Sequence, residues 1–229
     1  MNITIRHASE TDIDFIIEAV MSAEACGTEI ISYCRIFNIS KTELSELLKS
    51  IIIEDIEGQE LSLSTFKIAL CDGERAGAIS FWIEGVEGDS SMIKAQILSH
   101  FIGSERWNSA AEKIKIVSST HIDRKKNSLQ IESVYVKPEF RGNKIAQKII
   151  LHEMGHLQKN SPEICMAQVM TMNQNRPAIK MYESMGFVKS AETSSDNPAI
   201  TDILPGSGRV MFEGEIKSIV QSENIYHEH

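Results

Sequence analysis

The stretch VYVKPEFRGNKIAQKII, residues 134–150, joins the end of a strand to the start of a helix. Val134 to Val136 are typical of a strand, and the isoleucines from Ile145 to Ile150 follow the spacing of one helical face. Arg141 and Gly142 lie between the two elements. The first turn of a helix has up to four backbone N–H groups without partners and a partial positive charge, so this junction predicts an anion site. The alternative is an exposed arginine and a turn glycine before an ordinary helix.

The residues around this junction predict a strand, a helix and a second strand. SLQIESVYV (128–136) is strand-like, GNKIAQKIILHEMGHLQKN (142–160) has helical periodicity, and EICMAQVMT (163–171) is again strand-like. A helix that connects two strands of one sheet by a right-handed crossover leaves them parallel. We therefore expect residues 128–136 and 163–171 to be parallel neighbours.

The N-terminal part of the chain predicts further strands and helices. Residues 2–8 alternate as a strand, and a helix is expected after Thr11. Ser40 and Glu43 form a capping-box pattern at the start of a second helix, expected over residues 41–56. The dipeptide Asp72-Gly73 separates two strand-like runs, which is the signal of an antiparallel hairpin.

The C-terminal part predicts one more helix and two closing strands. RPAIKMYESM (176–185) begins with proline at an early helical position and ends before Gly186. The two strands that follow are expected on either side of a long polar loop at residues 191–208. The predicted fold class is α/β, with a mixed, mostly antiparallel sheet flanked by helices.

Length and composition predict a single domain over residues 1–229. The chain is 42% hydrophobic and 24% charged, as is ordinary for a globular protein. Val86 to Asn127 is less regularly patterned and predicts an insert of mostly helical character. No apolar run approaches the ~20 residues of a membrane span, and no secretory pattern opens the chain, so a cytoplasmic protein without a membrane partner is expected. Tyr226 to His229 are expected to fray.

Charge and cysteine usage disfavour two classes of partner. A net charge of -9 disfavours a general affinity for nucleic-acid phosphates. The four cysteines show no C-x-x-C spacing, which argues against a zinc site and a disulfide framework. His152 and His156 are one helical turn apart, but no third ligand shares their spacing. We expect neither a nucleic-acid partner nor a metal site.

A second motif follows the junction at NRPAIKMYESMGF, residues 175–187. Its residues fit the spacing N-x-x-A-x-x-x-Y-x-x-x-G-F, with Asn175, Ala178, Tyr182, Gly186 and Phe187. Together with RGNKIA at 141–146, this motif resembles the GNAT N-acetyltransferase superfamily. In that family the pattern [Q/R]-x-x-G-x-[G/A] after a strand binds the diphosphate of acetyl-CoA. The resemblance implies acetyl-CoA as cosubstrate and a sheet that is splayed at its central strands.

The resemblance also implies which residues contact the cofactor. These are Val134, Tyr135, Val136, Arg141, Gly142, Asn143, Lys144, Ile145, Ala146 and Asn175. Main-chain groups of Val134 and Val136, next to a bulge, are expected to pair with the thioester carbonyl and the pantetheine arm. Asn175 could instead be a simple helix-start residue. Lys144 departs from the family, which has glycine there; its side chain either points outward or adds a charge to the phosphate site.

Two residues are candidates for the chemistry of acyl transfer. Tyr182 is expected to protonate the leaving thiolate, because a phenol with a pKa of about 10 keeps its proton at neutral pH and can donate it to the departing sulfur. Its alternative role is packing on an amphipathic helix. Glu132 lies two residues before Val134, on the expected same strand face, and is a candidate base for the ammonium group of the acceptor. Its alternative role is that of a charge on a half-exposed strand.

The expected reaction is direct transfer of an acetyl group from acetyl-CoA to a primary amine of a small molecule. The excess of acidic residues favours a polyamine-like or amino-sugar acceptor over an anionic one. A protein or peptide N-acetyltransferase and a non-catalytic acyl-CoA sensor are the alternatives. Either a monomer or a homodimer is compatible with the sequence.

Overall fold

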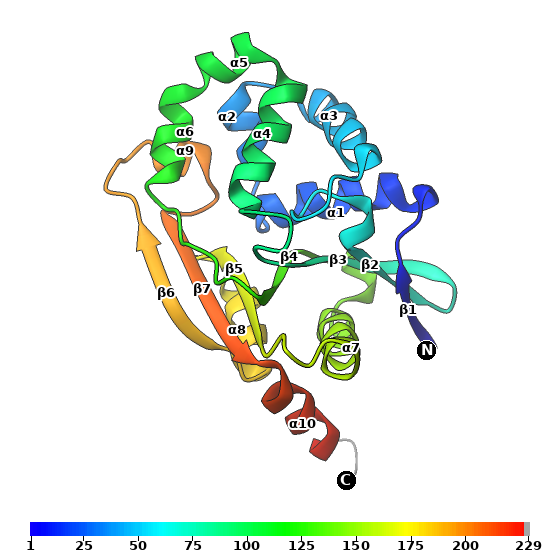
Figure 1. Cartoon of the computed structure of the whole chain (residues 1–229). Coiled ribbons are helices and arrows are strands. Elements are labelled where there is room, and N and C mark those ends of the chain that lie inside the picture. The colour runs from blue at the N-terminus through cyan, green and yellow to red at the C-terminus, as the bar shows by residue number, and fades with distance from the viewer. Residues whose placement is uncertain (227–229) are drawn as a thin grey trace.

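The computed structural model describes residues 1–226, which form a seven-stranded sheet flanked by helices (Figure 1). The strand order is β1-β2-β3-β4-β5-β7-β6; β4 and β5 are parallel and the other neighbours are antiparallel. The strands are β1 (Ile3–His7), β2 (Phe66–Cys71), β3 (Glu74–Ile83), β4 (Ser128–Val136), β5 (Met166–Met172), β6 (Val188–Ser194) and β7 (Gly208–Glu215). This sheet confirms the predicted fold class and the predicted parallel pair.

Helices cover both faces of the sheet, with α1 to α6 and α9 on one face and α7, α8 and α10 on the other (Figure 1). The first group is α1 (Ile13–Ala25), α2 (Ser32–Phe37), α3 (Lys41–Glu54), α4 (Ser90–Ile102), α5 (Ser104–Ser109), α6 (Ala111–Ser118) and α9 (Ile200–Ile203). The second group is α7 (Ile145–Asn160), α8 (Arg176–Ser184) and α10 (Ile216–Tyr226). His227 to His229, part of the terminus for which fraying is predicted, lie outside the described residues.

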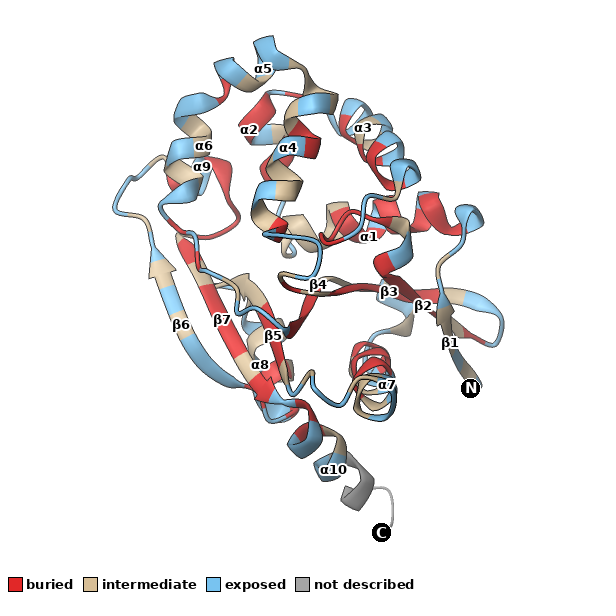
Figure 2. Cartoon of the chain, in the orientation of Figure 1, coloured by how far each residue is buried: buried red, intermediate tan, exposed pale blue. Residues whose placement is uncertain are grey.

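Two apolar clusters fix the helices to the sheet (Figure 2). Ile16 of α1 and Leu48 of α3 are fully buried in the first cluster, between the sheet and α1 to α6. Ile149 of α7 and Phe212 of β7 are buried in the second, on the opposite face. The central strands are therefore covered on both faces, and a functional group placed between them is held by two packed layers.

Two local sequence signals produce the turns and caps that they predict. The Glu43 backbone N–H donates to Ser40 Oγ at 3.1 Å, and the Ser40 backbone N–H donates to Glu43 Oε2 at 2.8 Å. This capping box begins α3. Asp72 and Gly73 have φ angles of 49° and 90° between β2 and β3, so the predicted hairpin turn is confirmed.

The segment at residues 191–208 is not the polar loop that its composition predicts. β6 continues to Ser194, and three apolar side chains that follow, Ile200, Ile203 and Leu204, are buried against α2 and α6. The prediction was wrong because the polar neighbours of these residues outnumber them. The sequence patterns also leave α2 and α10 unpredicted.

A bulge at Ser133 interrupts β4. Tyr135 pairs with Ala78 and Glu132 pairs with Ser80, so three steps along β4 match two steps along β3. Ser133 has a φ of 52°, in the left-handed region, which accommodates the extra residue. Side chains alternate between the two faces of a regular strand. After the extra residue, each side chain of β4 therefore lies on the opposite face from the one that regular alternation predicts.

The two parallel strands separate just before this bulge. Their ladder ends where Ile131 pairs with Val169, although β4 continues to Val136 and β5 to Met172. The facing edges of the remaining residues are not paired with each other. The predicted splay of the central strands is thus confirmed, and it opens a gap in the middle of the sheet.

Candidate active site

A cavity of about 620 Å³ occupies this gap. Its walls come from the splayed ends of β4 and β5, the loop before α7, the first turns of α7 and α8, and the C-terminal end of α1. It collects all of the site residues predicted from the sequence except Asn143. The two motifs, more than thirty residues apart in the chain, therefore line one space.

The loop between β4 and α7 presents a row of free backbone donors to the cavity. In the described part of the chain, the N–H groups of residues 142–147 have no acceptor among backbone or side-chain atoms. The first intrahelical acceptor, the Lys144 carbonyl, serves the Lys148 N–H at 3.0 Å. A helix N-terminus with several free donors attracts anions. The junction therefore has the free donors on which the prediction of an anion site rests.

Side chains of the same loop hold its shape. Arg141 Nε donates to the Val136 carbonyl at 3.1 Å, which ties the loop to the end of β4. Asn143 Nδ2 donates to the Phe140 carbonyl at 3.0 Å. Asn143 thus stabilises the loop from outside the cavity. Arg141 lines the cavity, and within residues 1–226 its remaining guanidinium nitrogens have no acceptor, so they are available to an anion.

Two residues of this loop have left-handed backbone conformations. Gly142 has a φ of 83°, and a Cβ added there would meet no atom within 4 Å. Lys144, where the related family has glycine, has a φ of 57° and precedes α7 directly. The backbone at Lys144 therefore keeps the glycine-like conformation although the residue carries a side chain, which is exposed and lines the cavity.

Tyr182 lies on α8 with its ring packed and its hydroxyl group unpaired. The residue is 3% exposed, and its ring centroid lies 6.0 Å from that of Phe187 and 6.1 Å from that of Phe212. No other described residue forms a hydrogen bond with its hydroxyl group. Burial, with smaller contributions from Glu132 and Cys26, raises the pKa of Tyr182 far above its usual value. The side chain is therefore a neutral phenol at the edge of the cavity.

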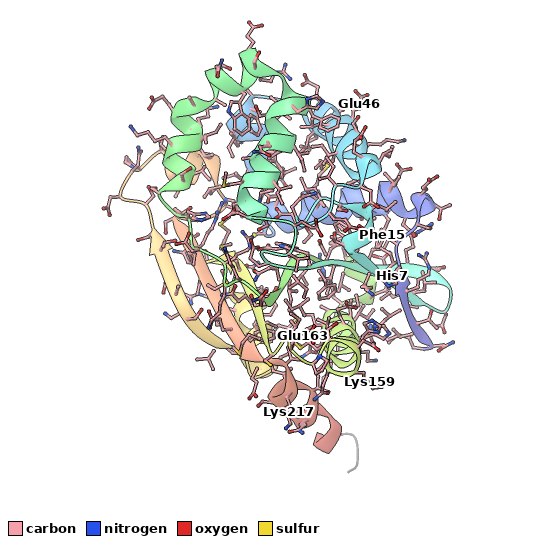
Figure 3. The ribbon with its side chains drawn as sticks, viewed as in Figure 1. His7, Phe15, Glu46, Lys159, Glu163 and Lys217 are labelled. Atoms are coloured by element: carbon pink, nitrogen blue, oxygen red, sulfur yellow. The ribbon has the colours of Figure 1, made fainter. Side chains whose placement is uncertain are left out.

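Tyr135 and Asn175 have partners within the protein. The Tyr135 hydroxyl donates to Glu18 Oε1 at 2.5 Å, and its ring lies 5.9 Å from that of Phe15, which Figure 3 labels on α1. Asn175 Oδ1 accepts from the Ala178 N–H at 3.4 Å, and its Nδ2 donates to Thr171 Oγ1. Asn175 is therefore the N-cap of α8, as its alternative interpretation predicts, and it also lines the cavity.

Glu132 and Val134 do not share a strand face, contrary to the sequence prediction. Glu132 pairs across the sheet with Ser80, on the face covered by α1 and α4, whereas Val134 packs into the opposite cluster beneath α7. The bulge at Ser133 causes this difference by reversing the alternation. Glu132 consequently points to the side of the cavity away from the free N–H groups.

The Glu132 carboxylate is held by an arginine that the sequence patterns do not single out. Arg124, in the segment before β4, donates from Nη2 to Glu132 Oε1 at 2.8 Å, and its guanidinium lies 5.4 Å from the centroid of the Trp82 ring. Burial and the nearby Glu60 carboxylate raise the pKa of Glu132 to about 7, against the opposing effect of Arg124. A carboxyl group of that pKa can accept and release a proton near neutrality.

Further charged side chains line the same side of the cavity. Lys94 of α4 donates to Glu60 Oε1 at 2.8 Å. Glu24 of α1 and Arg209 of β7 also line it. With Glu132 and Arg124, this acceptor-side cluster contains three carboxylates and three cations: Glu24, Glu60, Glu132, Lys94, Arg124 and Arg209. Apart from Glu132, sequence reasoning missed these residues, because they come from five separate segments and no local spacing connects them.

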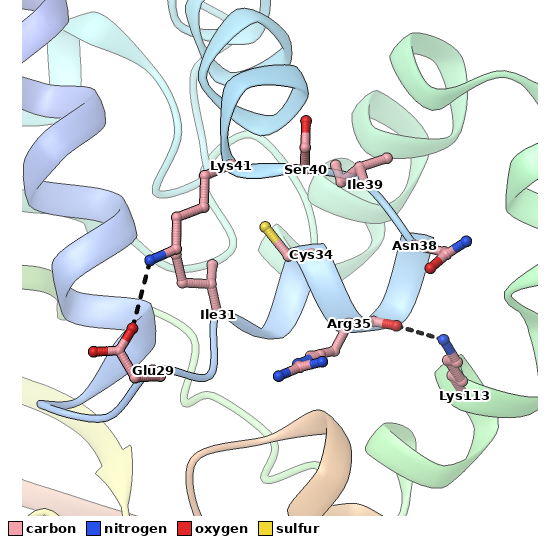
Figure 4. Close-up of a pocket in the computed structure, with 9 residues that line it drawn as sticks. All are labelled: Glu29, Ile31, Cys34, Arg35, Asn38, Ile39, Ser40, Lys41 and Lys113. Carbon is pink, nitrogen blue, oxygen red and sulfur yellow. Dashed lines mark hydrogen bonds and ion pairs between the residues drawn. The ribbon is translucent and has the colours of Figure 1, made fainter.

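A second hollow, of about 360 Å³, lies between α2, α3 and α6, away from both motifs (Figure 4). Lys41 Nζ lies 3.7 Å from Glu29 Oε2 across its mouth, and Lys113 Nζ donates to the Arg35 carbonyl at 2.6 Å. Two of its cations, Lys41 and Lys113, thus already contact acceptors of the protein, and it contains none of the predicted site residues. We do not assign it to the reaction.

Comparison with protein families decides the identity of the fold. Residues 55–199 match the family described as the acetyltransferase (GNAT) domain, which is more than half of the chain. The chain belongs to the GNAT acetyltransferase family. It is accordingly an acyltransferase that uses acetyl-CoA as its cosubstrate. A comparison with curated proteins finds no match. No helix in residues 1–226 is long and apolar enough to span a membrane.

Solved structures share the fold at low sequence identity. An N-acetyltransferase from Staphylococcus aureus Mu50 is 14% identical, with a TM-score of 0.56, covering 92% of this chain and 98% of its own. RimL, a ribosomal L7/L12 alpha-N-protein acetyltransferase in complex with coenzyme A, is 13% identical, with a TM-score of 0.56 and 94% coverage of both chains. The aminoglycoside acetyltransferase AAC(6')-Ib in complex with coenzyme A is 13% identical, with a TM-score of 0.52, covering 97% and 99%.

Proposed function

We propose that this protein transfers the acetyl group of acetyl-CoA to a primary amine of a small molecule by direct attack on the thioester. The observation that carries the proposal is the cavity between the splayed strands. It connects the free N–H groups of residues 142–147 with Tyr182 and Glu132 in one continuous space. Those are the three functions that acyl transfer from CoA requires: an anion site, an acid and a base.

The cofactor is proposed to lie along the cavity with its diphosphate on the N–H groups between Gly142 and Gln147. Arg141 and Lys144 add positive charge there. The pantetheine arm then runs between the unpaired edges of β4 and β5, where main-chain groups of Val134 to Val136 are available to its amides. The bound coenzyme A of RimL and AAC(6')-Ib, which share the fold, supports this assignment.

Glu132 is proposed to take a proton from the acceptor ammonium, directly or through water. The neutral amine attacks the thioester carbonyl carbon, and a C–N bond forms while a main-chain N–H near Val134 stabilises the oxyanion. The attacking nitrogen, which now carries one proton more than an amide, releases that proton to solvent. When the C–S bond breaks, the departing thiolate takes the proton of the Tyr182 hydroxyl. The proton held by Glu132 returns to Tyr182 through solvent, which restores both groups.

A small acceptor is favoured over a protein by the lining of the acceptor side. Glu60, Lys94, Arg124 and Arg209 belong to four different segments and surround that end of the cavity. Similar folds occur in enzymes of both kinds, since RimL is a protein acetyltransferase and AAC(6')-Ib is an aminoglycoside acetyltransferase. The single domain, the cytoplasmic location and the monomeric or homodimeric state stay predictions.

The deciding experiment measures CoA release with a thiol reagent for a panel of small amines and of peptides with free N-termini or lysines. The proposal expects turnover with small amines and none above background hydrolysis with peptides. Turnover with peptides alone would support a protein acetyltransferase. Calorimetric binding of acetyl-CoA without turnover on any acceptor would support the non-catalytic sensor.

A further inference from the structure

The acceptor side of the cavity carries three cations beside its three carboxyl groups, although the whole chain carries a net charge of -9. The acceptor-side cluster therefore has no excess of acidic groups. The overall acidity of the chain, which favours a polycationic acceptor, therefore does not describe the surface that the acceptor meets. The local charges are the better guide to its chemistry.

Four members of the cluster neutralise one another. Lys94 Nζ lies 2.8 Å from Glu60 Oε1, and Arg124 Nη2 lies 2.8 Å from Glu132 Oε1. These two pairs are held in place by burial: the Arg124 side chain is 7% exposed, and that of Glu60 is 10% exposed. A charge that is already paired in a buried site gives a ligand little additional attraction.

The other two members, Glu24 and Arg209, remain without an ionic partner. Within residues 1–226, neither has an oppositely charged side chain at ion-pair distance. Both are half-buried and line the same cavity as Tyr182. Arg209 is close enough for its charge to act on the carboxyl groups of Glu24 and Glu60, but it forms no contact ion pair with them. One carboxyl group, whose pKa is raised by burial, and one guanidinium are thus left for a ligand.

We propose that the acceptor is an amino-acid-like zwitterion, whose ammonium group binds near Glu24 and Glu132 and whose carboxylate binds Arg209. A guanidinium recognises a planar carboxylate through two parallel N–H donors, which an ammonium cannot do. A single unpaired cation matches the single charge of a carboxylate better than the larger charge of a phosphate. This inference rests on the proposed function, because it identifies the acceptor of that same reaction.

A polyamine or an amino sugar fits the cluster less well. Such an acceptor brings positive charge but no anion, so Arg209 would stay unpaired in a partly desolvated wall beside the incoming cation. Leaving a buried charge without its partner is unfavourable. A peptide N-terminus has the same deficit, because its nearest carboxylate is replaced by an amide.

The experiment compares amino acids with the amines that differ from them by loss of the carboxylate. The pairs are alanine and ethylamine, leucine and 3-methylbutylamine, phenylalanine and 2-phenylethylamine, and histidine and histamine. CoA release gives kcat/KM for each compound, and calorimetry in the presence of CoA gives its binding. Wild-type protein is expected to prefer at least one amino acid over its amine by tenfold or more. Converting that amino acid to its amide should remove the preference.

Variants connect the preference to Arg209. Arg209→Gln should reduce the ratio between amino acid and amine to about one, mainly by raising KM for the amino acid, while KM for acetyl-CoA stays unchanged. Glu24→Gln should weaken both members of a pair, so that the ratio is kept. Arg106→Gln, at an exposed arginine of α5, is the matched control and should leave every ratio unchanged.

The outcomes separate this inference from the proposed function. If the amines are turned over as well as the amino acids or better, the zwitterion is wrong while the acetyltransferase proposal stands. An unchanged ratio in Arg209→Gln would equally overturn it. If no compound of either kind is turned over or bound, the zwitterion is wrong, and the acetyltransferase proposal fails as well only if the wider panel of small amines is also inactive.

Discussion

Arg124 and Glu132 form a buried ion pair, with Nη2 and Oε1 2.8 Å apart, at the point where β4 leaves its parallel neighbour. Both residues precede the bulge at Ser133, so the pair lies on the face covered by α1 and α4, whereas Val134, after the bulge, lies on the opposite face. Arg124 is fixed in turn by the Trp82 ring and by Ser91 Oγ. The arginine therefore sets the position and lowers the proton affinity of the carboxyl group that is proposed as the base.

The pH dependence of catalysis should report this pair. Because Glu132 must be deprotonated to act as base and its pKa is raised to about 7, kcat/KM should rise with pH through about 7 and then level. In Glu132→Gln, kcat/KM should no longer rise with pH through about 7, and activity should fall by 10² to 10⁴-fold. Arg124→Met should move the limb to higher pH, since the arginine favours the ionised carboxylate.

A variant at an exposed arginine is the control for the shift of the pH profile expected in Arg124→Met. Arg106→Met, on α5, should leave the limb in place. A limb that reported the amine of the acceptor instead of Glu132 would not move in Arg124→Met, and that result would remove Glu132 as the titrating base. The profiles should be measured at subsaturating acceptor and saturating acetyl-CoA.

Gly142→Ala should weaken acetyl-CoA binding more than its effect on stability explains. The added Cβ meets open space in the free protein, but this space is where the diphosphate is proposed to lie. Backbone strain at a φ of 83° costs about 1–2 kcal/mol by itself. Gly73→Ala, in the β2–β3 turn with a φ of 90° and also in open space, is a control with the same kind of strain.

Calorimetry with CoA and melting curves are to be compared for the two alanine variants. Both should be destabilised by a similar amount, and only Gly142→Ala should bind CoA tenfold or more weakly. Equal CoA affinities would mean that the diphosphate does not approach Gly142.

Lys144→Gly should stabilise the protein. A left-handed conformation costs a residue with a Cβ about 1–2 kcal/mol, and the change to glycine removes this cost. Against this, glycine lowers the free energy of unfolding by about 0.4–1 kcal/mol, because it increases the entropy of the unfolded chain. The net gain should be about 0.5–1 kcal/mol in denaturant unfolding. Lys148→Gly, one turn into α7 and also exposed, should instead destabilise by about 1 kcal/mol. Destabilisation of both variants would contradict the assignment of strain to Lys144.

Asp12 should contribute stability that disappears in acid. Burial opposes its ionisation, but hydrogen bonds from Arg6, Arg75 and Ser9 outweigh burial and hold its pKa well below the usual range. Its contribution is therefore complete above the unfolded pKa of about 3.9 and is lost as pH falls toward the folded pKa. Asp12→Asn should cost about 3 kcal/mol at pH 7, and this difference should shrink below pH 4.

Asp14→Asn, two residues later and exposed on α1, is the control for that change. It should alter the free energy of unfolding by less than about 0.5 kcal/mol at either pH. A constant difference between Asp12→Asn and wild type from pH 7 to pH 3 would show that the Asp12 carboxylate is not what the two arginines stabilise.

Local signals in the sequence were sufficient for the parts of the site that are contiguous. The junction at Arg141 and Gly142 and the helix that bears Tyr182 are each defined within a few residues, so spacing reveals them. The order of strand, helix and strand then places the two motifs side by side. The same reasoning failed for the face of Glu132, because a bulge is set by one residue, Ser133, whose type does not require a positive φ.

The acceptor side could not be predicted in this way. Glu24, Lys94 and Arg209 lie far apart in sequence, and each alone is an ordinary charged residue on a helix or strand. Whether each of these residues can bind a ligand depends on which charges pair with each other after folding. Tertiary contacts determine that pairing. The buried Arg124 is an example, since its role follows from Trp82 and Glu132, two strand residues that only the fold brings to it.

Tyr182→Phe should separate catalysis from packing. The change removes one hydroxyl group that has no partner among the described residues, so the fold and the affinity for acetyl-CoA should be preserved. Loss of a general acid typically costs 10² to 10⁴-fold in kcat, which is on the order of 3–5 kcal/mol of barrier. Tyr135→Phe is the matched control: its hydroxyl donates to Glu18, so its loss should cost about 1 kcal/mol of stability while turnover per folded molecule is kept.

The two variants are therefore expected to give opposite patterns of melting temperature and turnover. Turnover should be measured at saturating acetyl-CoA with the best acceptor, and a pre-steady-state burst would show whether product release hides the chemical step. If chemistry limits the rate and Tyr182→Phe loses less than threefold, Tyr182 is not the acid. The thiolate would then take its proton from water or from the acceptor amine itself, and Glu132 would be left as the side chain that moves a proton in this reaction.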